Sequence, residues 1–376
     1  MCVTQFGATF SYNFVQIFFP FFIMKISPYP VQYTLLWIGV ILGSSNLCAA
    51  ITSPFWGSLT HRFSPKMLYL RAVLSNLVTF LVMAFTTDLY VILFVNILQG
   101  LTGGISTIGL IIVSSSSRQE DIPSHISLYQ SVMTLGQLTG PPIGSLAAVA
   151  LGYRGAFLAC SAILLGSMLY CYLYVKEVPC LPGREPGSRR TGLDKPIVMG
   201  WVLCFMAMIH LSFLPSILPQ VFHHLNVDRA VALKLAGTVV MCYTAAAMVG
   251  TYLFGGLSKR TGLRKLITTL LVVGVLSQGA LVLSRGVLDF TLIRMIQTGA
   301  MAAFVPLVVS IFARESRGGV IGFLNSARFT GNAIGPMFAT SVLAVSSIPV
   351  LYLSISLLTL LALLGVKFVF KTAPSG

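Results

Sequence analysis

Apolar runs long enough to cross a lipid bilayer follow one another along almost the whole chain. A transmembrane helix needs about 20 mostly apolar residues, and this pattern predicts twelve of them. They are expected at 4–26, 34–57, 67–87, 89–113, 126–151, 154–175, 196–218, 230–257, 266–284, 288–313, 318–343 and 348–370. The longest polar interruption divides these segments six and six. We therefore predict an all-α membrane protein of twelve transmembrane helices in two pseudo-symmetric six-helix bundles, 1–176 and 196–376, joined by a cytoplasmic linker at 177–195.

The composition agrees with that pattern and excludes several classes of protein. Only 9% of the 376 residues are charged and 56% are hydrophobic, whereas about a quarter of a soluble domain is charged. The net charge of +15 lies mostly in short loops between apolar runs, so it indicates membrane orientation rather than nucleic-acid binding. The seven cysteines include no CxxC pair. We expect no disulfide framework, metal site, cofactor or enzymatic activity.

The distribution of lysine and arginine predicts the orientation. With the amino terminus inside, seventeen of these residues fall on the cytoplasmic side and five on the outer side, as the positive-inside rule requires. The first segment begins almost at Met1 without basic residues ahead of it. We interpret it as a retained membrane helix rather than a signal peptide, and we expect both termini on the cytoplasmic side of the inner membrane.

A glycine-proline pattern occurs once in each half of the chain. It comprises Gly136, Gly140, Pro141 and Gly144 in the first half, and Gly331, Gly335 and Pro336 in the second. Glycines four residues apart share one helix face and allow another backbone to approach closely. A proline removes one helix hydrogen bond and loosens the helix there. The pattern predicts a closely packed, flexible helix in each half.

Two other stretches repeat at nearly the same offset of about 195–198 residues. The loop from Gly57 to Lys66, which contains Arg62, matches the loop from Gly255 to Lys265, which contains Arg260. Gln99 lines up with Gln297. Related halves of this kind are typical of secondary transporters, whose substrate site lies between the repeats near the bilayer midplane.

These motifs resemble the major facilitator superfamily, and within it the twelve-span drug:proton antiporter branch of multidrug efflux proteins. Residues 53–62 (SPFWGSLTHR) are similar to the signature between spans 2 and 3, G-x-L-a-D-R-x-G-R-K. Residues 136–145 (GQLTGPPIGS) are similar to the span 5 antiporter signature, G-x-x-x-G-P-x-x-G-G, and 152–157 (GYRGAF) to the turn before span 6. The resemblance covers nearly the whole chain and implies export of amphipathic compounds driven by proton antiport.

Two positions depart from the family signatures. His61 stands where the family has an acid that closes a cytoplasmic charge network, and Asn96 replaces the span 4 arginine that the family uses in proton coupling. The second half keeps the latter pattern as Arg294-x-x-Gln297. In addition, none of the nine Asp and Glu residues falls at mid-membrane, where a carboxylate of raised pKa is the usual proton carrier.

Arginines within spans are candidate cavity residues, because charge inside a membrane is costly and usually faces an interior. Arg328 shares a helix with Asn325 and Asn332, which form a polar stripe with it, and Arg294 lies in the tenth segment with Gln297. The alternative for Arg328 is a structural arginine bonded to backbone or snorkelling to the interface.

Uncharged polar residues in the spans are further candidates for the substrate cavity. Gln130 and Gln137 lie seven apart in the fifth segment, and Asn13 and Gln16 lie three apart in the first. The alternative is that they only form interhelical hydrogen bonds. His210 could carry protons near neutral pH, or it could be a buried packing residue.

The sequence predicts a monomeric efflux permease in the lipid bilayer that exports small amphipathic substrates by alternating access, coupled to protons. One alternative is an exporter or facilitator of an anionic or zwitterionic, siderophore-like metabolite without carboxylate-based coupling. Another, from a different class, is a membrane sensor that transports nothing.

Overall fold

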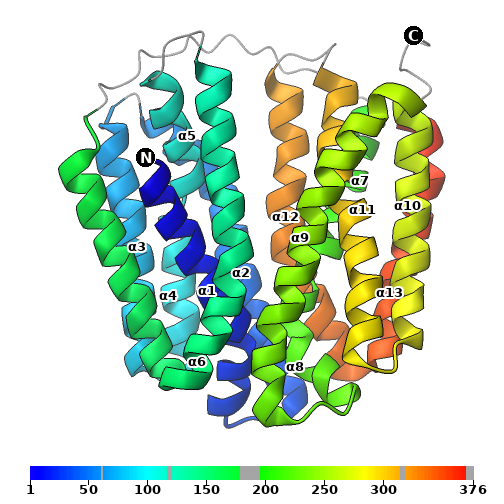
Figure 1. Ribbon diagram of the computed structural model, residues 1–376, viewed down its shortest axis with the longest axis horizontal. Coiled ribbons are helices and arrows are strands. Elements are labelled where there is room, and N and C mark those ends of the chain that lie inside the picture. The colour runs from blue at the N-terminus through cyan, green and yellow to red at the C-terminus, as the bar shows by residue number, and fades with distance from the viewer. Residues whose placement is uncertain (61, 117–120, 178–194, 314–317, 370–376) are drawn as a thin grey trace. The chain divides into compact units, whose positions relative to one another are not determined.

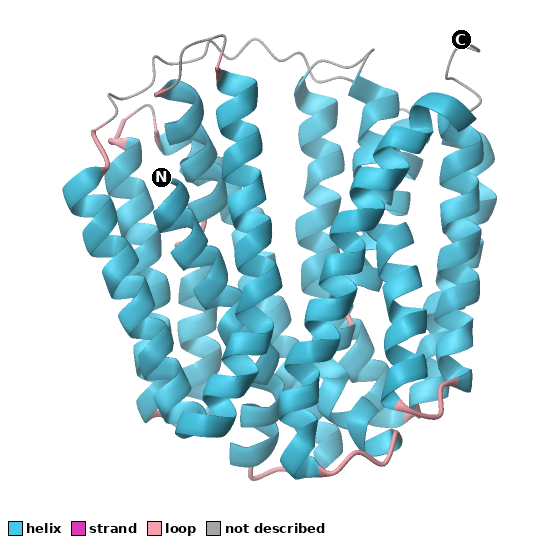
Figure 2. Ribbon diagram, viewed as in Figure 1, coloured by secondary structure: helices cyan, strands magenta, loops and turns pink. Residues whose placement is uncertain are grey.

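The computed structural model describes residues 1–60, 62–116, 121–177, 195–313 and 318–369, which form helices and no strand (Figure 2). The helices of the first half are α1 (Cys2–Ile26), α2 (Val31–Leu59), α3 (Pro65–Phe85), α4 (Leu89–Leu101), α5 (Ile105–Ser115) and α6 (Ile122–Tyr174). Those of the second half are α7 (Lys195–Ser212), α8 (Leu214–His224), α9 (Arg229–Thr261), α10 (Leu263–Ala280), the 3-10 helix η1 (Leu281–Leu283), α11 (Val287–Ala313), α12 (Gly318–Val345) and α13 (Ile348–Val369) (Figure 1).

The helices have the length and composition of membrane spans. Among the described residues, ten helices are long and apolar enough to cross a bilayer, and one of them, α6, contains two of the predicted segments. Helix α12 is also long enough, but its polar residues make it less apolar than the ten. Leucines such as Leu173, Leu288 and Leu364 are exposed, which suits contact with lipid. The predicted all-α membrane fold is confirmed.

The fourth predicted segment is not one continuous helix. It is broken between α4 and α5, where Gly104 has a φ of 103°. This left-handed conformation is open to glycine at little cost. The predicted span over 89–113 corresponds to the candidate membrane span Leu89–Ser115, whose helix is interrupted at 102–104.

Two other predicted boundaries also differ from the structure. The seventh segment is divided at Phe213 and continues to His224, because Pro215 cannot donate the backbone hydrogen bond that would continue α7. The fifth and sixth segments merge into α6, interrupted only by Gly152, whose φ of 71° and ψ of 170° are not helical.

The structure has two compact units. The first contains Met1–Pro30, Val40–Glu185 and Arg229–Met241, and the second contains Val31–Gly39, Pro186–Asp228 and Cys242–Gly376. Each unit is thus made mainly from one half of the chain, with the first residues of one long helix from the other half. The predicted linker lies almost entirely outside the described residues, so the division at 177–195 stays a prediction.

In the first unit, the glycine face of α6 lies directly against α1 (Figure 1). A Cβ atom added at Gly136 would lie 2.9 Å from the backbone nitrogen of Phe10, and one at Gly140 would lie 2.9 Å from its carbonyl oxygen. At Gly144 it would overlap the backbone of Phe14. Only glycine allows the two helices to approach this closely, as predicted.

The second unit repeats this contact between α12 and α7. A Cβ atom added at Gly331 would lie 3.1 Å from the carbonyl oxygen of Phe205, and one at Gly335 would lie 3.5 Å from the backbone nitrogen of Phe213. Ser212 adds a hydrogen bond of 3.1 Å to the carbonyl of Gly331. Each glycine-proline helix therefore packs against the first helix of its own half of the chain, α6 on α1 and α12 on α7. This equivalence supports the internal repeat.

Candidate functional site

A fully buried arginine lies inside the second unit. The guanidinium of Arg294 on α11 donates to the carbonyl oxygen of His210 at 2.6 Å and to Oε1 of Gln297. It also lies over the rings of Phe213 and Tyr243, with 4.9 and 5.1 Å from Cζ to the ring centroids. Its exposure is 0%. Aromatic faces and oxygen acceptors stabilise the cation here, and no carboxylate of the described residues is paired with it.

The hydrogen bonds continue from Arg294 to α13. Since Oε1 of Gln297 accepts from Arg294, its Nε2 is the donor to Nδ1 of His210, at 2.9 Å, and to Oε1 of Gln278. Nε2 of His210 lies 2.7 Å from Oγ1 of Thr359, whose hydroxyl donates to its own helix. This chain connects α7, α10, α11 and α13 within the second unit.

The hydrogen-bond directions define the state of His210. Its Nδ1 accepts a hydrogen bond, so the ring is neutral and carries its proton on Nε2, which donates to Thr359. Arg294, Gln297 and His210 each have 0% exposure. All three sequence candidates thus lie together in one buried network rather than on an open surface of this unit.

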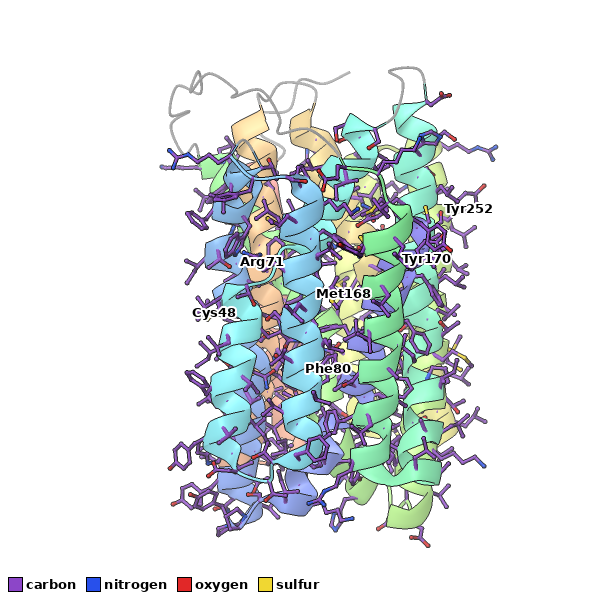
Figure 3. The ribbon with its side chains drawn as sticks, turned by 90° about the vertical axis from the view of Figure 1, so that its left-hand side faces the viewer. Cys48, Arg71, Phe80, Met168, Tyr170 and Tyr252 are labelled. Carbon is purple, nitrogen blue, oxygen red and sulfur yellow. The ribbon has the colours of Figure 1, made fainter. Side chains whose placement is uncertain are left out.

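The first unit has a small pocket at the place where α1, α2, α3 and α4 meet, with a cavity volume of about 30 Å³. We call it the first-unit pocket. Its lining residues are Tyr12, Val15, Gln16, Phe19, Leu42, Ser45, Phe80, Met83, Asn96 and Gln99. Aromatic and aliphatic side chains form most of the wall, and the amide or hydroxyl groups of five residues supply polar atoms. Figure 3 shows Phe80 on α3 in the lower part of that helix.

The break between α4 and α5 is stabilised by two side chains from neighbouring helices. Nε1 of Trp56 donates to the carbonyl of Leu101 at 2.7 Å, and Nη2 of Arg71 donates to those of Thr102 at 2.9 Å and Gly103 at 3.2 Å. The guanidinium of Arg71 also stacks on the Trp56 ring, 3.2 Å from its centroid. Carbonyl groups freed at a helix end need partners inside a membrane. Arg71 lies on α3 above Phe80 in Figure 3.

The remaining candidates are more dispersed. Arg328 on α12 is exposed, and among the described residues its guanidinium has no hydrogen-bond partner. Asn332 is half-buried one turn further on, while the side chain of Asn325 lies outside the described residues. Gln130 and Gln137 are exposed on α6.

Two candidates on α1 have different surroundings. Asn13 is half-buried and donates to the carbonyl of Thr9 at 2.8 Å, a bond within its own helix. Gln16 is also half-buried and lines the first-unit pocket. Of these two residues, Gln16 lines the first-unit pocket and Asn13 does not.

The expected gate between the second and third segments is only partly visible. Arg62 is exposed three residues beyond the end of α2, and Arg260 is exposed in the last turn of α9. His61 and the surroundings of Gly57 lie outside the described residues. The role of these residues in gating stays a prediction.

Sequence reasoning missed Arg71, Trp56 and Gln278. The Gly103-Gly104 pair was the available signal for the helix break that Arg71 and Trp56 stabilise. No sequence signal identifies Gln278, since a single glutamine in an apolar run has no spacing that reveals its partner.

A comparison with protein families decides the class of the chain. The family described as Major Facilitator Superfamily matches residues 1–295 and 200–376. The chain belongs to this superfamily. It is a transporter, not an enzyme, and the predicted family is confirmed.

Among curated superfamily members, the chain is similar to multidrug resistance protein MdtG of Enterobacter lignolyticus, with 25% identity over 90% of this chain and 83% of the relative. It is 23% identical to an uncharacterized MFS-type transporter, YuxJ, of Bacillus subtilis, over 90% of this chain and 89% of that one.

Solved structures of superfamily transporters share the fold. A point mutant of the nucleoside transporter NupG matches with a TM-score of 0.82 at 14% identity, covering 98% of both chains. A D-xylose-proton symporter matches with a TM-score of 0.78 at 16% identity, covering 99% of this chain and 97% of that one.

Proposed function

We propose that this protein is a secondary transporter that exports small amphipathic compounds by alternating access. The observation that carries the proposal is the close packing of α6 on α1 through Gly136, Gly140 and Gly144, repeated by α12 on α7. These glycines belong to the segment that resembles the efflux signature, and the similarity to the multidrug resistance protein MdtG supports drug-like compounds as substrates. The first-unit pocket, with its aromatic and amide lining, supports an amphipathic substrate.

Proton antiport is the coupling that the family resemblance implies, and we include it in the proposal. The described acids are Asp88, Asp121, Glu177, Asp228 and Asp289, all in loops or in the first turn of a helix. Proton coupling therefore depends on groups other than a mid-membrane carboxylate among the described residues. We also propose that both termini face the cytoplasm, on the basis of the lysine and arginine distribution.

One observation favours a second candidate function. Arg328 presents a guanidinium without a described partner in the middle of α12, and such a group attracts anions. An exporter of an anionic or zwitterionic metabolite would use it to hold a carboxylate.

Purified protein in proteoliposomes tests both functions. With an imposed pH gradient, we expect uphill movement of a lipophilic cation such as ethidium. Transport that does not respond to the gradient would contradict proton coupling, and no transport of any amphipathic compound would contradict the export function. Loss of transport confined to carboxylate compounds in Arg328→Ala would favour the second candidate, with Ser131→Ala on the exposed face of α6 as the control.

A further inference from the structure

A second pocket of the first unit lies at the end where α1 begins. Its cavity volume is about 370 Å³, and both ends of α6 and the last turn of α5 form much of its wall. We call it the tyrosine pocket, after Tyr170 and Tyr174 in that wall. The other lining residues used below are Ser116, His125, Leu128 and Lys176. Figure 3 shows Tyr170 in the upper part of this unit, above Phe80.

The tyrosine pocket lies at the level of a membrane interface. A helix rises about 1.5 Å per residue, so about 30 Å separate Tyr174 from Tyr153 at the other end of the same arm of α6. This is about the thickness of the hydrocarbon core of a bilayer. Lys25 lies over the Tyr153 ring, 5.5 Å from its centroid, and Lys176 follows Tyr174 by two residues. Tyrosines and lysines anchor helices at the two interfaces, so the pocket is level with the lipid head groups.

A buried layer separates the tyrosine pocket from the interior of the unit. Gln5 lies one turn beyond the lining residue Cys2, and its Oε1 accepts hydrogen bonds from Tyr129 at 2.6 Å and Tyr69 at 3.2 Å. Nε2 of the same amide donates to Thr9 at 3.1 Å. Gln5 and the two tyrosines are at most 1% exposed. The pocket therefore ends at this layer and is a recess for a ligand from outside the unit.

The polar groups of the wall suit an anion. Lys176 carries a positive charge, and His125, Ser116 and the two tyrosines supply N–H and O–H donors. Among the described residues, no carboxylate lines the pocket. Asp121 and Glu177 are near His125 and Lys176 in the sequence but are not part of the wall. Within the described part of the chain, Lys176 also has no ion-pair partner. A phosphodiester would receive charge-assisted hydrogen bonds here.

Apolar surface continues from the tyrosine pocket toward the lipid. Leu128 and Tyr174 in the wall are 56% and 71% exposed, and Leu173 beside Tyr174 is 68% exposed. The rings of Tyr170 and Tyr174 pack together, with 4.9 Å between their centroids. A soluble phosphate ester would leave this surface uncovered, whereas the acyl chains of a phospholipid would lie against it.

We propose that the tyrosine pocket binds an anionic phospholipid, with its phosphodiester against Lys176 and His125 and its acyl chains on Leu128 and Tyr174. The hydroxyl groups of Ser116 and of the tyrosines hold the glycerol of the head group. Basic pockets between membrane helices bind anionic head groups in this way. The inference does not depend on the proposed export function, because binding is measured without transport.

Native mass spectrometry of the purified, delipidated protein in detergent tests the proposal. Phosphatidylglycerol is compared with phosphatidylcholine that carries the same acyl chains. We expect one phosphatidylglycerol to bind at least about fivefold more tightly, since each basic residue near an anionic head group favours binding by about that factor. Glycerophosphoglycerol and inorganic phosphate, at the same concentration as the lipid, should not displace it.

Three variants locate the bound lipid. Lys176→Gln removes the charge and is expected to weaken phosphatidylglycerol binding about fivefold. Ser116→Trp keeps the charge but fills part of the pocket, so it should weaken binding by at least about the same factor. Lys265→Gln is the matched control, because it removes an exposed cation in the first turn of α10 that does not line the pocket, and it should bind as the unmodified protein does.

Thermal unfolding of each variant shows whether it has folded. If Ser116→Trp does not fold, the comparison of Lys176→Gln with Lys265→Gln decides the question, since both lysines are exposed.

Equal binding of the two lipids, unchanged binding in either folded pocket variant, or an equal loss in Lys176→Gln and Lys265→Gln would overturn the proposal. Displacement by glycerophosphoglycerol or phosphate would assign the pocket to a soluble phosphate compound and overturn the lipid assignment. Transport without selective lipid binding contradicts only this inference. Selective lipid binding without any transport contradicts only the proposed function.

Discussion

Nε2 of Gln297 donates a 2.9 Å hydrogen bond to Nδ1 of His210, and this bond makes the histidine a neutral acceptor. The direction follows from Arg294, which occupies Oε1 of the same amide. If His210 were protonated, the N–H on its Nδ1 would point at the N–H on Nε2 of Gln297. This repulsion would be relieved only if the Gln297 amide flipped. The turned amide would then direct its N–H groups at the Arg294 guanidinium. The network therefore stabilises one protonation state of His210.

The first prediction concerns proton coupling. In His210→Asn, the side-chain oxygen can still accept from Gln297, but the bond to Thr359 is lost. We expect the pH dependence of transport to be unchanged, and the stability to fall by about 1 kcal/mol. Transport measured over a series of imposed pH gradients, with thermal unfolding alongside, checks both. Thr359→Val is the matched control, since it removes the same bond from the other side. Loss of the pH response in a folded His210→Asn protein would assign the proton to His210 after all.

The second prediction concerns the buried cation. Arg294→Met removes the charge but leaves the carbonyl of His210 and Oε1 of Gln297 without donors. Each unsatisfied buried acceptor costs about 1–3 kcal/mol, so we expect a large fall in the unfolding temperature. In Arg294→Met combined with Gln297→Leu, one of these acceptors is absent, and the double variant should be less destabilised than the sum of the two single variants. Simple additivity in a double-mutant cycle would mean that the two side chains do not act together.

The third prediction concerns the glycine face of α6. In Gly140→Ala, the new Cβ atom would lie 2.9 Å from the carbonyl oxygen of Phe10 and 3.0 Å from Cβ of Asn13, so α1 must shift. We expect destabilisation of about 1–3 kcal/mol from overpacking, and reduced transport. Gly166→Ala in the same helix is the control, because nothing lies within 4 Å of its added Cβ atom. It should be neutral or slightly stabilising, since alanine favours helix. Similar behaviour of the two variants would show that α1 can move away at little cost.

The fourth prediction concerns the break between α4 and α5. Arg71→Met leaves the carbonyls of Thr102 and Gly103 without the donor that now satisfies them, and we expect a loss of about 1–3 kcal/mol. Trp56→Phe keeps a ring under the guanidinium but removes the donor to Leu101, so its cost should be smaller. Gly104→Ala would force a non-glycine residue to adopt a φ of 103°, at a cost of about 1–3 kcal/mol. Chemical denaturation in detergent compares the three. Normal stability of Arg71→Met would mean that other groups satisfy these carbonyls.

The sequence predicted that the chain is a membrane protein and that one helix in each half packs closely against a neighbour. Both predictions depend only on local composition. Runs of about 20 apolar residues must form helices in lipid whatever their neighbours are. Likewise, Gly136, Gly140 and Gly144 recur at a helical spacing, which permits close approach by any partner. That the partner is α1, approached at Phe10 and Phe14, required the structure.

The site was less predictable, since a polar residue inside a span has several possible partners. Arg294, Gln297 and His210 were all identified as candidates, yet 84 residues of sequence separate the arginine from the carbonyl that it binds. Their union in a single buried network depends on how α7 packs against α11. Gln278, the fourth member, had no local signature at all.

By itself, the sequence determined that the chain is a helical membrane protein with an internal repeat, and it showed that Asn96 stands where the repeat has Arg294. Only the tertiary structure decided what that difference does. In the second unit the guanidinium of Arg294 lies over the rings of Phe213 and Tyr243, and in the first unit Asn96 lines a small pocket. The physical reason is that a cavity is made by side chains from several helices, and their volumes combine only when the helices are packed together.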